Sequence, residues 1–184
     1  ADFVACHNPS YITKGFKIVQ DVKPGGVFLI NCQWTLEELE HHLDAASKRY
    51  IAENNIQLYT INAIDLAIKV GMGKRTNTIL QSAFFSLAKV MAAEDAVKYM
   101  KDAAERSYAK KGMDVVEKNW NAIDAGATAY VKIDVPAAWA AAECNKAEAE
   151  LVGNADTVKV VKTILNPVGK MDGYSLPVSA FDGL

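Results

Sequence analysis

Residues 22 to 36 read VKPGGVFLINCQWTL, and this stretch decides the fold of the chain. Its centre, residues 27–30, is apolar without a break, which is typical of a strand covered on both faces in a parallel sheet. Residues 23–26, KPGG, end a preceding helix, while Thr35 and Glu38 match a capping box that begins the next one. We therefore predict a buried strand that lies between two helices.

Two further strands follow the same scheme. We predict strands at residues 3–6 and 56–61, with helices at residues 11–22 and from residue 36 to about residue 54 between the strands. Strand, helix, strand, helix, strand in this order indicates right-handed crossovers and a parallel sheet. The predicted fold class is α/β, with a mostly parallel, Rossmann-like sheet.

The second half of the chain changes in character. Residues 64–128 carry apolar stripes at helical spacing, so we predict a helical region. Residues 130–136 form a short predicted edge strand that Pro136 ends. The residues that follow are rich in Ala and Glu with little to bury, as in a linker or a surface helix. We therefore predict a domain at residues 1–136 and an extended linker or tail at residues 137–184.

Composition excludes several classes of function. The chain has 20 Lys and Arg residues against 22 Asp and Glu residues, a net charge of −2. It lacks the basic cluster that binds a phosphate backbone, so we expect no nucleic-acid partner. No apolar run approaches the roughly 20 residues that span a bilayer, and the first ten residues do not match a signal peptide. We expect a soluble chain, and the missing initiator Met is typical of an internal cut.

Three cysteines, Cys6, Cys32 and Cys144, occur without a C-x-x-C motif. Their odd number argues against a disulfide framework and favours a reducing compartment. If the strands that carry Cys6 and Cys32 are neighbours, a thiolate or zinc site with His7 is one alternative, but only one histidine accompanies them. Buried free thiols are the expected state.

Residues 71–76, GMGKRT, have the look of a phosphate-binding loop. A true loop of this kind follows a strand and has a glycine five positions before its Gly-Lys pair. This segment follows a predicted helix and lacks that glycine. We instead expect Gly71 and Gly73 to end one helix and Thr76 or Asn77 to cap the next.

Residues 37–42, EELEHH, place two Glu/His pairs at helical i, i+4 spacing, Glu37 with His41 and Glu38 with His42. Such pairs are able to bind a metal, but no third ligand is in view and the pairs lie largely off the apolar stripe. We therefore expect a solvated helix face and no metal-binding residue.

Polar clusters follow each predicted strand directly. They are HNPS at residues 7–10, NCQW at residues 31–34, and Asn62. The carboxyl ends of parallel strands are where ligands bind in open α/β folds. Asparagine side chains there offer donors and acceptors without a nucleophile or a general base, so binding is better supported than catalysis. Plain turn chemistry is an equal alternative, because Asn also favours turns by itself.

The segments that contain these clusters resemble a known family. The likeness is carried by ADFVACHNPSYI at residues 1–12, VKPGGVFLINCQW at residues 22–34, RYIAENNIQLYTINAI at residues 49–64 and VGMGKRTNTILQSAFF at residues 70–85. It continues to VKIDVP and to SLPVSAF in the tail. The chain resembles the central γ-type domain of the single-chain pyruvate:ferredoxin (flavodoxin) oxidoreductases, with the lead-in to their iron–sulfur segment.

The resemblance implies that the chain is part of a much larger enzyme. The family oxidatively decarboxylates pyruvate with thiamine diphosphate, forms acetyl-coenzyme A and CO2, and passes electrons through 4Fe–4S clusters to ferredoxin or flavodoxin. It implies a homodimeric parent in the cytoplasm, or in the hydrogenosome of a protist. No cluster-binding cysteine series and no thiamine diphosphate segment occurs in this sequence, so the resemblance implies no catalytic residue here and an inactive isolated chain.

The family's γ-type domain begins with a further strand and a Gly-rich turn, which do not precede Ala1 here. We therefore expect an open sheet edge. In this family the domain is associated with holding coenzyme A against the thiamine-bound intermediate, and the strand-end clusters are where we expect that contact. A phosphate-rich ligand also needs cations, and Lys14 lies near these loops in sequence. The residues that we expect to face coenzyme A are Asn8, Pro9, Ser10, Asn31, Gln33, Asn62, Lys74 and Arg75.

An alternative interpretation makes the segment a structural module without a ligand. Its helical half, residues 76–128, would dock onto sister domains and set their spacing. The basis is an aromatic content greater than one core needs. The aromatic residues concerned are Phe84, Phe85, Tyr99, Tyr108 and Trp120.

Overall fold

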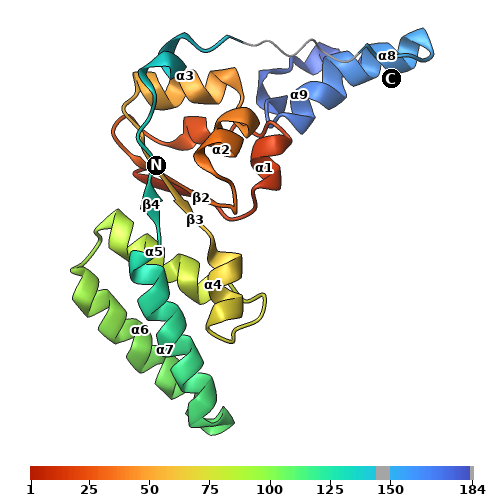
Figure 1. The fold of residues 1–184 in the computed structure, drawn as a ribbon. Helices are drawn as coiled ribbons and strands as arrows, with labels where there is room; N and C mark the ends of the chain where they lie inside the picture. The colour runs from red at the N-terminus through yellow and green to blue at the C-terminus, as the bar shows by residue number, and fades with distance from the viewer. Residues whose placement is uncertain (144–149, 183–184) are drawn as a thin grey trace.

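A four-stranded sheet forms the centre of the computed structural model, which describes residues 1–143 and 150–182 (Figure 1). The strands lie in the order β1 (Phe3–Cys6), β2 (Val27–Asn31), β3 (Gln57–Ile61) and β4 (Val131–Lys132). The first three are parallel, and β4 runs antiparallel to β3. The predicted α/β class with a mostly parallel sheet is therefore confirmed, and β1 lies at an open edge of this sheet.

Side chains of β2 explain why its sequence is uninterrupted. Phe28 and Ile30 point into one core, and Leu29 points into a second core on the other face. All three are at most 1% exposed. Since burying one such side chain contributes about 1.5–3 kcal/mol, the strand strongly favours a position between two layers of helices.

The first layer contains α1 (Ser10–Thr13), the 3-10 helix η1 (Val19–Asp21), α2 (Leu36–His42) and α3 (Ala45–Glu53). The prediction of one helix over residues 11–22 was wrong. The backbone turns at Gly15, whose φ of 74° is left-handed and favours glycine.

The second predicted helix of this layer is also interrupted. The capping box at its start is confirmed, because Glu38 N donates to Thr35 Oγ1 at 3.2 Å and Thr35 N donates to Glu38 Oε2 at 2.8 Å. The helix ends at His42, and Asp44 caps a new one by accepting from Ser47 N at 2.7 Å. The predicted single helix is therefore two helices, with buried Leu39 in α2 and buried Ser47 and Ile51 in α3.

The second layer is the predicted helical half. It contains α4 (Ala63–Lys69), α5 (Asn77–Ala88), α6 (Ala93–Tyr108), the 3-10 helix η2 (Ala109–Lys111) and α7 (Met113–Thr128). Helices α5, α6 and α7 pack on one another and extend away from the sheet (Figure 1). Gly126 lets α7 approach α5 closely, since a Cβ there would meet Ile79 O at 2.3 Å.

Residues 133–142 form a strap that returns from β4 to the first layer. Ile133 N donates to Leu58 O at 2.9 Å, and Trp139 in the 3-10 helix η3 (Ala137–Ala141) is 2% exposed in the first core. Its Nε1 donates to Glu40 Oε1 at 3.1 Å. The composition after residue 136 predicted little burial, and the buried side chain of Trp139 corrects that prediction. The division after residue 136 stays a prediction.

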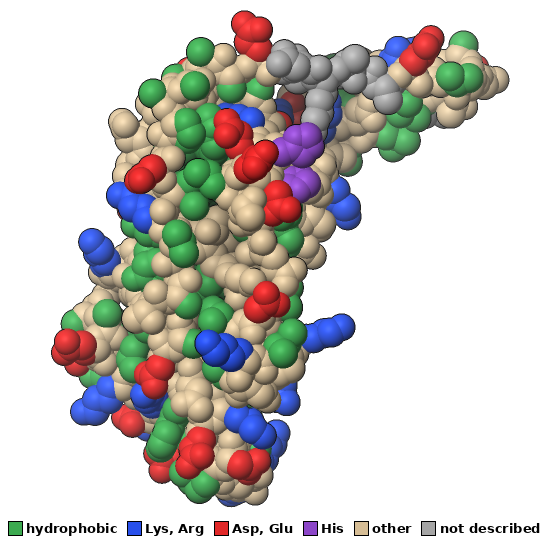
Figure 2. Space-filling view, in the orientation of Figure 1, with side chains coloured by type: hydrophobic (Ala, Val, Ile, Leu, Met, Phe, Trp, Pro, Cys, Tyr) green, Lys and Arg blue, Asp and Glu red, His purple; other side chains and the backbone are tan. Residues whose placement is uncertain are grey.

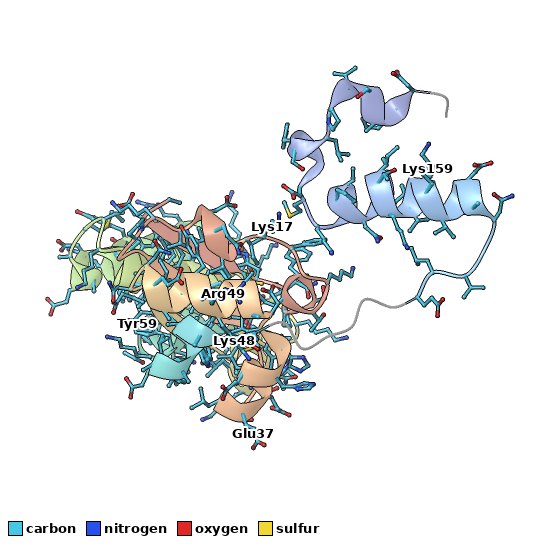
Figure 3. All side chains as sticks on the ribbon, turned by 90° about the horizontal axis from the view of Figure 1, so that it is seen from above. Lys17, Glu37, Lys48, Arg49, Tyr59 and Lys159 are labelled. Atoms are coloured by element: carbon cyan, nitrogen blue, oxygen red, sulfur yellow. The ribbon has the colours of Figure 1, made fainter. Side chains whose placement is uncertain are left out.

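Residues of α3 hold the strap from the other side. The Lys48 ammonium lies 5.9 Å from the centre of the Trp139 ring, and Arg49 donates to Ala142 O. Figure 3 shows Lys48 and Arg49 on α3 close to the strap. The strap is therefore fixed by packing, a cation–π contact and hydrogen bonds.

Residues 154–182 form an arm that stands apart from the body (Figures 1 and 3). Its elements are α8 (Ala155–Val160), the π-helix η4 (Val161–Leu165), α9 (Asn166–Gly169) and the 3-10 helices η5 (Gly173–Ser175) and η6 (Val178–Phe181). These elements pack mainly on one another. Lys17 of the body forms an ion pair of 2.8 Å with Asp172 of the arm. No helix in the described part of the chain has the length and apolar character needed to cross a bilayer.

Candidate ligand site at the strand ends

The carboxyl ends of β1, β2 and β3 lie side by side, because these strands are parallel and adjacent. The polar side chains there are Asn8, Gln33, Asn62 and Asp65, and we call these four residues the ledge. They come from the loop after β1, the loop after β2 and the start of α4. The structure thus places six of the eight predicted site residues at the carboxyl ends of the strands, namely Asn8, Pro9, Ser10, Asn31, Gln33 and Asn62.

Asn31 is the brace beneath the ledge. It is 4% exposed, its Nδ2 donates to His7 O at 3.0 Å, and its Oδ1 accepts from Ala63 N at 3.0 Å. Both ends of its amide therefore bind backbone groups of the neighbouring strand ends. Asn31 would therefore affect ligand binding indirectly, by fixing the position of those loops.

Asp65 joins two of the predicted residues. Gln33 Nε2 donates to Asp65 Oδ1 at 2.8 Å, and Asn62 Nδ2 donates to Asp65 Oδ2 at 2.7 Å. The oxygen of Asn62 also caps α4 by accepting from Asp65 N at 3.2 Å. Asp65 was not among the residues predicted from the sequence, although Asn followed three residues later by an acidic residue resembles the spacing of a capping box. An exposed carboxylate thus lies at the centre of the ledge.

The loop after β1 is built from turn chemistry. Asn8 Oδ1 accepts from Ser10 N at 3.0 Å, and Pro9 occupies the N-cap position of α1. Asn8 is exposed, while Pro9 and Ser10 are half-buried. The oxygen of Asn8 is therefore used within the turn, and its amide nitrogen faces solvent.

A cavity of about 210 Å³ lies beside the ledge. Asn62, Asp65, Leu66, Lys69 and Ala129 line it. Lys69 stands one turn beyond Asp65 on α4, which puts a cation and an anion in the same cavity. Lys69 was also not predicted, and its i, i+4 spacing from Asp65 is the signal for it in the sequence.

The predicted cations lie elsewhere. Lys74 and Arg75 are exposed in the loop that follows α4, at the opposite end of that helix from Asn62. A helix of seven residues is about 10 Å long. Lys14, also exposed, directly follows α1. The structure therefore separates Lys74 and Arg75 from the ledge by the length of α4.

The loop at residues 71–76 differs from a phosphate-binding loop, since it joins two helices. Gly71 and Gly73 have φ values of 76° and 64°, in agreement with their predicted role as helix-ending residues. Thr76 occupies the N-cap position of α5, but its side chain forms no capping hydrogen bond. The expectation that Thr76 or Asn77 caps this helix therefore holds for the position of Thr76, although its side chain adds no hydrogen bond.

Cys6 and Cys32 are both buried free thiols, as expected. Burial raises the pKa of Cys6 to about 11, with the nearby Cys32 as a smaller cause, and burial also raises the pKa of Cys32. Both thiols are therefore protonated and unreactive at neutral pH. Cys144 lies outside the described residues.

The paired histidines of α2 lie on a solvated face. His42 stacks on Trp34 with ring centres 4.3 Å apart, and His41 lies 5.6 Å from His42. Figure 2 shows histidines among acidic side chains on this surface. Across residues 1–143 and 150–182, no group of three or more His, Cys, Asp or Glu residues has an arrangement able to hold a metal ion.

Together these features define an α/β domain with helices on both faces of its sheet and polar side chains at the strand ends. Residues 1–129 match the family model described as pyruvate ferredoxin/flavodoxin oxidoreductase. The chain belongs to this family. It is 44% identical over its full length to a pyruvate-flavodoxin oxidoreductase of Enterobacter agglomerans. It is 38% identical over 98% of its length to a pyruvate:ferredoxin oxidoreductase of Moorella thermoacetica.

The chain spans 15% of the length of each of these two relatives. Its fold is also similar to the crystal structure of the PORC subunit of a pyruvate oxidoreductase from Thermotoga maritima. The TM-score is 0.56 at 15% identity, and the match covers 72% of this chain and 65% of that subunit. At this identity the likeness concerns the fold alone.

Proposed function

We propose that the chain is the coenzyme A-facing domain of a larger enzyme that oxidatively decarboxylates pyruvate to acetyl-coenzyme A and CO2. The observation that carries this proposal is the ledge, where Gln33, Asn62 and Asp65 form a hydrogen-bonded group beside a cavity that contains Lys69. Family membership gives the reaction class, and the ledge is the polar surface at the place where α/β sheets bind ligands.

The residues of the ledge fit parts of coenzyme A. The Asp65 carboxylate accepts hydrogen bonds and would repel a phosphate, so it suits the amide N–H groups or the adenine amino group of the ligand. Lys69, in the same cavity, suits a phosphate. Coenzyme A supplies the thiol that takes up the acetyl group. The residues of this chain bind and orient the ligand while the reaction takes place on other parts of the enzyme.

The other partners proposed for the parent follow from the family. They are thiamine diphosphate, 4Fe–4S clusters, and ferredoxin or flavodoxin as electron acceptor, in a homodimer. We assign the clusters to other parts of the parent, because the three cysteines of this chain do not form a cluster-binding series. Bacterial relatives such as those of Enterobacter agglomerans and Moorella thermoacetica favour the cytoplasm over a hydrogenosome.

Calorimetric titration of coenzyme A into the 184-residue chain tests the proposal. We expect saturable binding that Gln33→Ala and Lys69→Ala each weaken by about 5- to 30-fold, the loss of a hydrogen bond or ion contact of 1–2 kcal/mol. Lys98→Ala, an exposed change on α6, is the matched control and leaves affinity unchanged. Equal binding by all variants would remove the ledge from the coenzyme A site.

A second candidate function is docking, and the arm supports it better than the helical half does. Of the five aromatic residues on which the docking interpretation rests, Tyr99 alone is exposed, at 60%. Phe84 packs edge-on against Phe3, and Trp120 Nε1 donates to Lys101 O at 3.1 Å. The arm, in contrast, exposes Leu165, Val168, Met171, Tyr174, Val178 and Phe181.

We propose that these arm side chains pack on another domain of the parent polypeptide. An apolar surface of this kind is typical of a contact with a partner. In a full-length parent, Val168→Ser together with Val178→Ser is expected to increase proteolysis of the arm, while Lys159→Ser on the same arm leaves it unchanged. Equal proteolysis of all three proteins would contradict a docked arm.

A further inference from the structure

The helical half contains a small polar cavity that no ledge residue lines. It lies between α5, α6 and α7 and has a volume of about 190 Å³. Every residue that lines it is uncharged. Its amide and hydroxyl groups come from Asn77, Thr78, Gln81, Ser107, Tyr108 and Asn119.

Asn119 is the most buried polar residue of this cavity. It is 3% exposed and lies on the face of α7 that also carries Val116 and Ile123 into the interior. Its Nδ2 donates to Val115 O at 2.8 Å. Within the described part of the chain, its Oδ1 forms no side-chain hydrogen bond and is accessible from the cavity. A polar side chain at such a position is unfavourable unless its hydrogen bonds are completed.

The remaining polar groups of the cavity are also available. Among the described residues, the side chains of Asn77, Thr78, Gln81, Ser107 and Tyr108 form no hydrogen bond with the protein. Thr78 and Tyr108 are half-buried, while the other three are exposed at the rim. Donors and acceptors from three helices therefore converge on one space, whose apolar side is supplied by Met100, Ile123 and alanines of α6.

We propose that this cavity binds a primary carboxamide. The group is both a donor and an acceptor, and it complements an unpaired amide oxygen surrounded by hydroxyl and amide groups. The absence of lysine and arginine from the lining argues against a carboxylate or a phosphate.

The size of the cavity limits the occupant. It is smaller than the roughly 300–1,000 Å³ of pockets that hold whole drug-sized ligands, so it fits one ring or one side chain. The carboxamide belongs either to a free small molecule or to an Asn or Gln side chain of a partner protein. This site is separate from the ledge and does not rest on coenzyme A binding.

Titration of benzamide into the isotope-labelled 184-residue chain, followed by two-dimensional NMR, tests the proposal. We expect saturable shifts of the Asn119 side-chain amide and of the Thr78 backbone amide. Benzoate is expected to bind at least about tenfold more weakly, because its charge would have no cationic partner in the cavity. N-acetyl-glutamine amide separates the two sources. Tighter binding than that of benzamide indicates a partner's side chain, and weaker binding indicates a free molecule.

Variants complete the design. Asn119→Leu fills the cavity and is expected to abolish the benzamide shifts, whereas Asn121→Leu, an exposed change on the same helix, retains them. Ser107→Ala, at the exposed rim, provides a second variant in case Asn119→Leu does not fold, and it is expected to weaken binding about threefold or more. The proposal is overturned by an absence of saturable shifts in a folded sample, by equal binding of benzoate, or by unchanged binding in Ser107→Ala and in a folded Asn119→Leu. Displacement of benzamide by coenzyme A would also overturn it, since the cavity would then belong to that ligand.

Discussion

Replacing Trp139 by alanine is expected to destabilise the protein by about 4 kcal/mol. Removal of a large buried aromatic side chain costs roughly 3–5 kcal/mol, and Trp139 is 2% exposed in the first core. Its hydrogen bond to Glu40 and its contact with Lys48 are lost as well. For a chain of this size, each kcal/mol lowers the Tm by about 2–4 °C. The expected decrease in Tm is therefore about 8–16 °C.

Thermal unfolding followed by circular dichroism, supported by urea denaturation, measures this change. Trp139→Phe keeps most of the packing and loses the indole N–H, so it is expected to cost much less than the alanine variant. Tyr174→Ala removes a fully exposed aromatic residue of the arm and is expected to stay within about 0.5 kcal/mol of the parent. If Trp139→Ala also stays within about 1 kcal/mol, the strap does not pack on the first core and residues 137–141 are a surface linker.

Three further outcomes are expected. Gly126→Ala should lower the free energy of unfolding, measured by urea denaturation, by about 1–3 kcal/mol, because a Cβ 2.3 Å from Ile79 O forces α5 and α7 apart. An unchanged denaturation midpoint would show that the two helices are not in such close contact. Asn31→Ala should cost about 2–4 kcal/mol, since His7 O and Ala63 N both lose a partner, and Gln33→Ala, which removes an exposed hydrogen bond, should cost less than 1 kcal/mol. Cys6 and Cys32 should react slowly with iodoacetamide at pH 8 in the native state and rapidly in urea, as read by mass spectrometry of the labelled peptides, because burial raises the pKa of both thiols. Rapid labelling of both native thiols would contradict their burial. The raised pKa of Cys6 also predicts that the free energy of unfolding decreases as the pH rises from about 9 towards about 11, because the thiol ionises at a lower pH in the unfolded chain than in the folded one.

Sequence patterns predicted the elements whose position depends on the burial of apolar side chains or on a specific cap. The uninterrupted apolar run of β2 requires cover on both faces, and Thr35 with Glu38 has the spacing of one specific cap. Helical spacing was misleading before β2. Ile12 and Val19 are both buried, but Gly15 lets the backbone turn between them. The helix-like spacing of these two residues is therefore produced by a compact loop that buries both, and not by one continuous helix.

The candidate site was predicted in part, because strand ends can be located from sequence while side-chain partners cannot. Asn31 was expected to face a ligand, yet its amide braces two loops. Asp65 and Lys69 lie on the helix that follows Asn62, and only the direction of that helix brings them into the cavity. Trp139 was missed for a related reason, since its partners Glu40 and Lys48 lie about 90 to 100 residues earlier in the chain.

The strap has a consequence for the order in which the chain folds during synthesis. The first core needs Trp139, but residues 63–128 of the helical half emerge from the ribosome before it does. Contacts between residues that are distant in sequence form late, because closing a long loop has a high entropic cost. We expect the bundle of α5, α6 and α7 to form before the strap docks, because Ser82 and Ile123 are 41 residues apart whereas Trp139 and Glu40 are 99 residues apart. The layer that begins the chain would be completed only when the strap arrives.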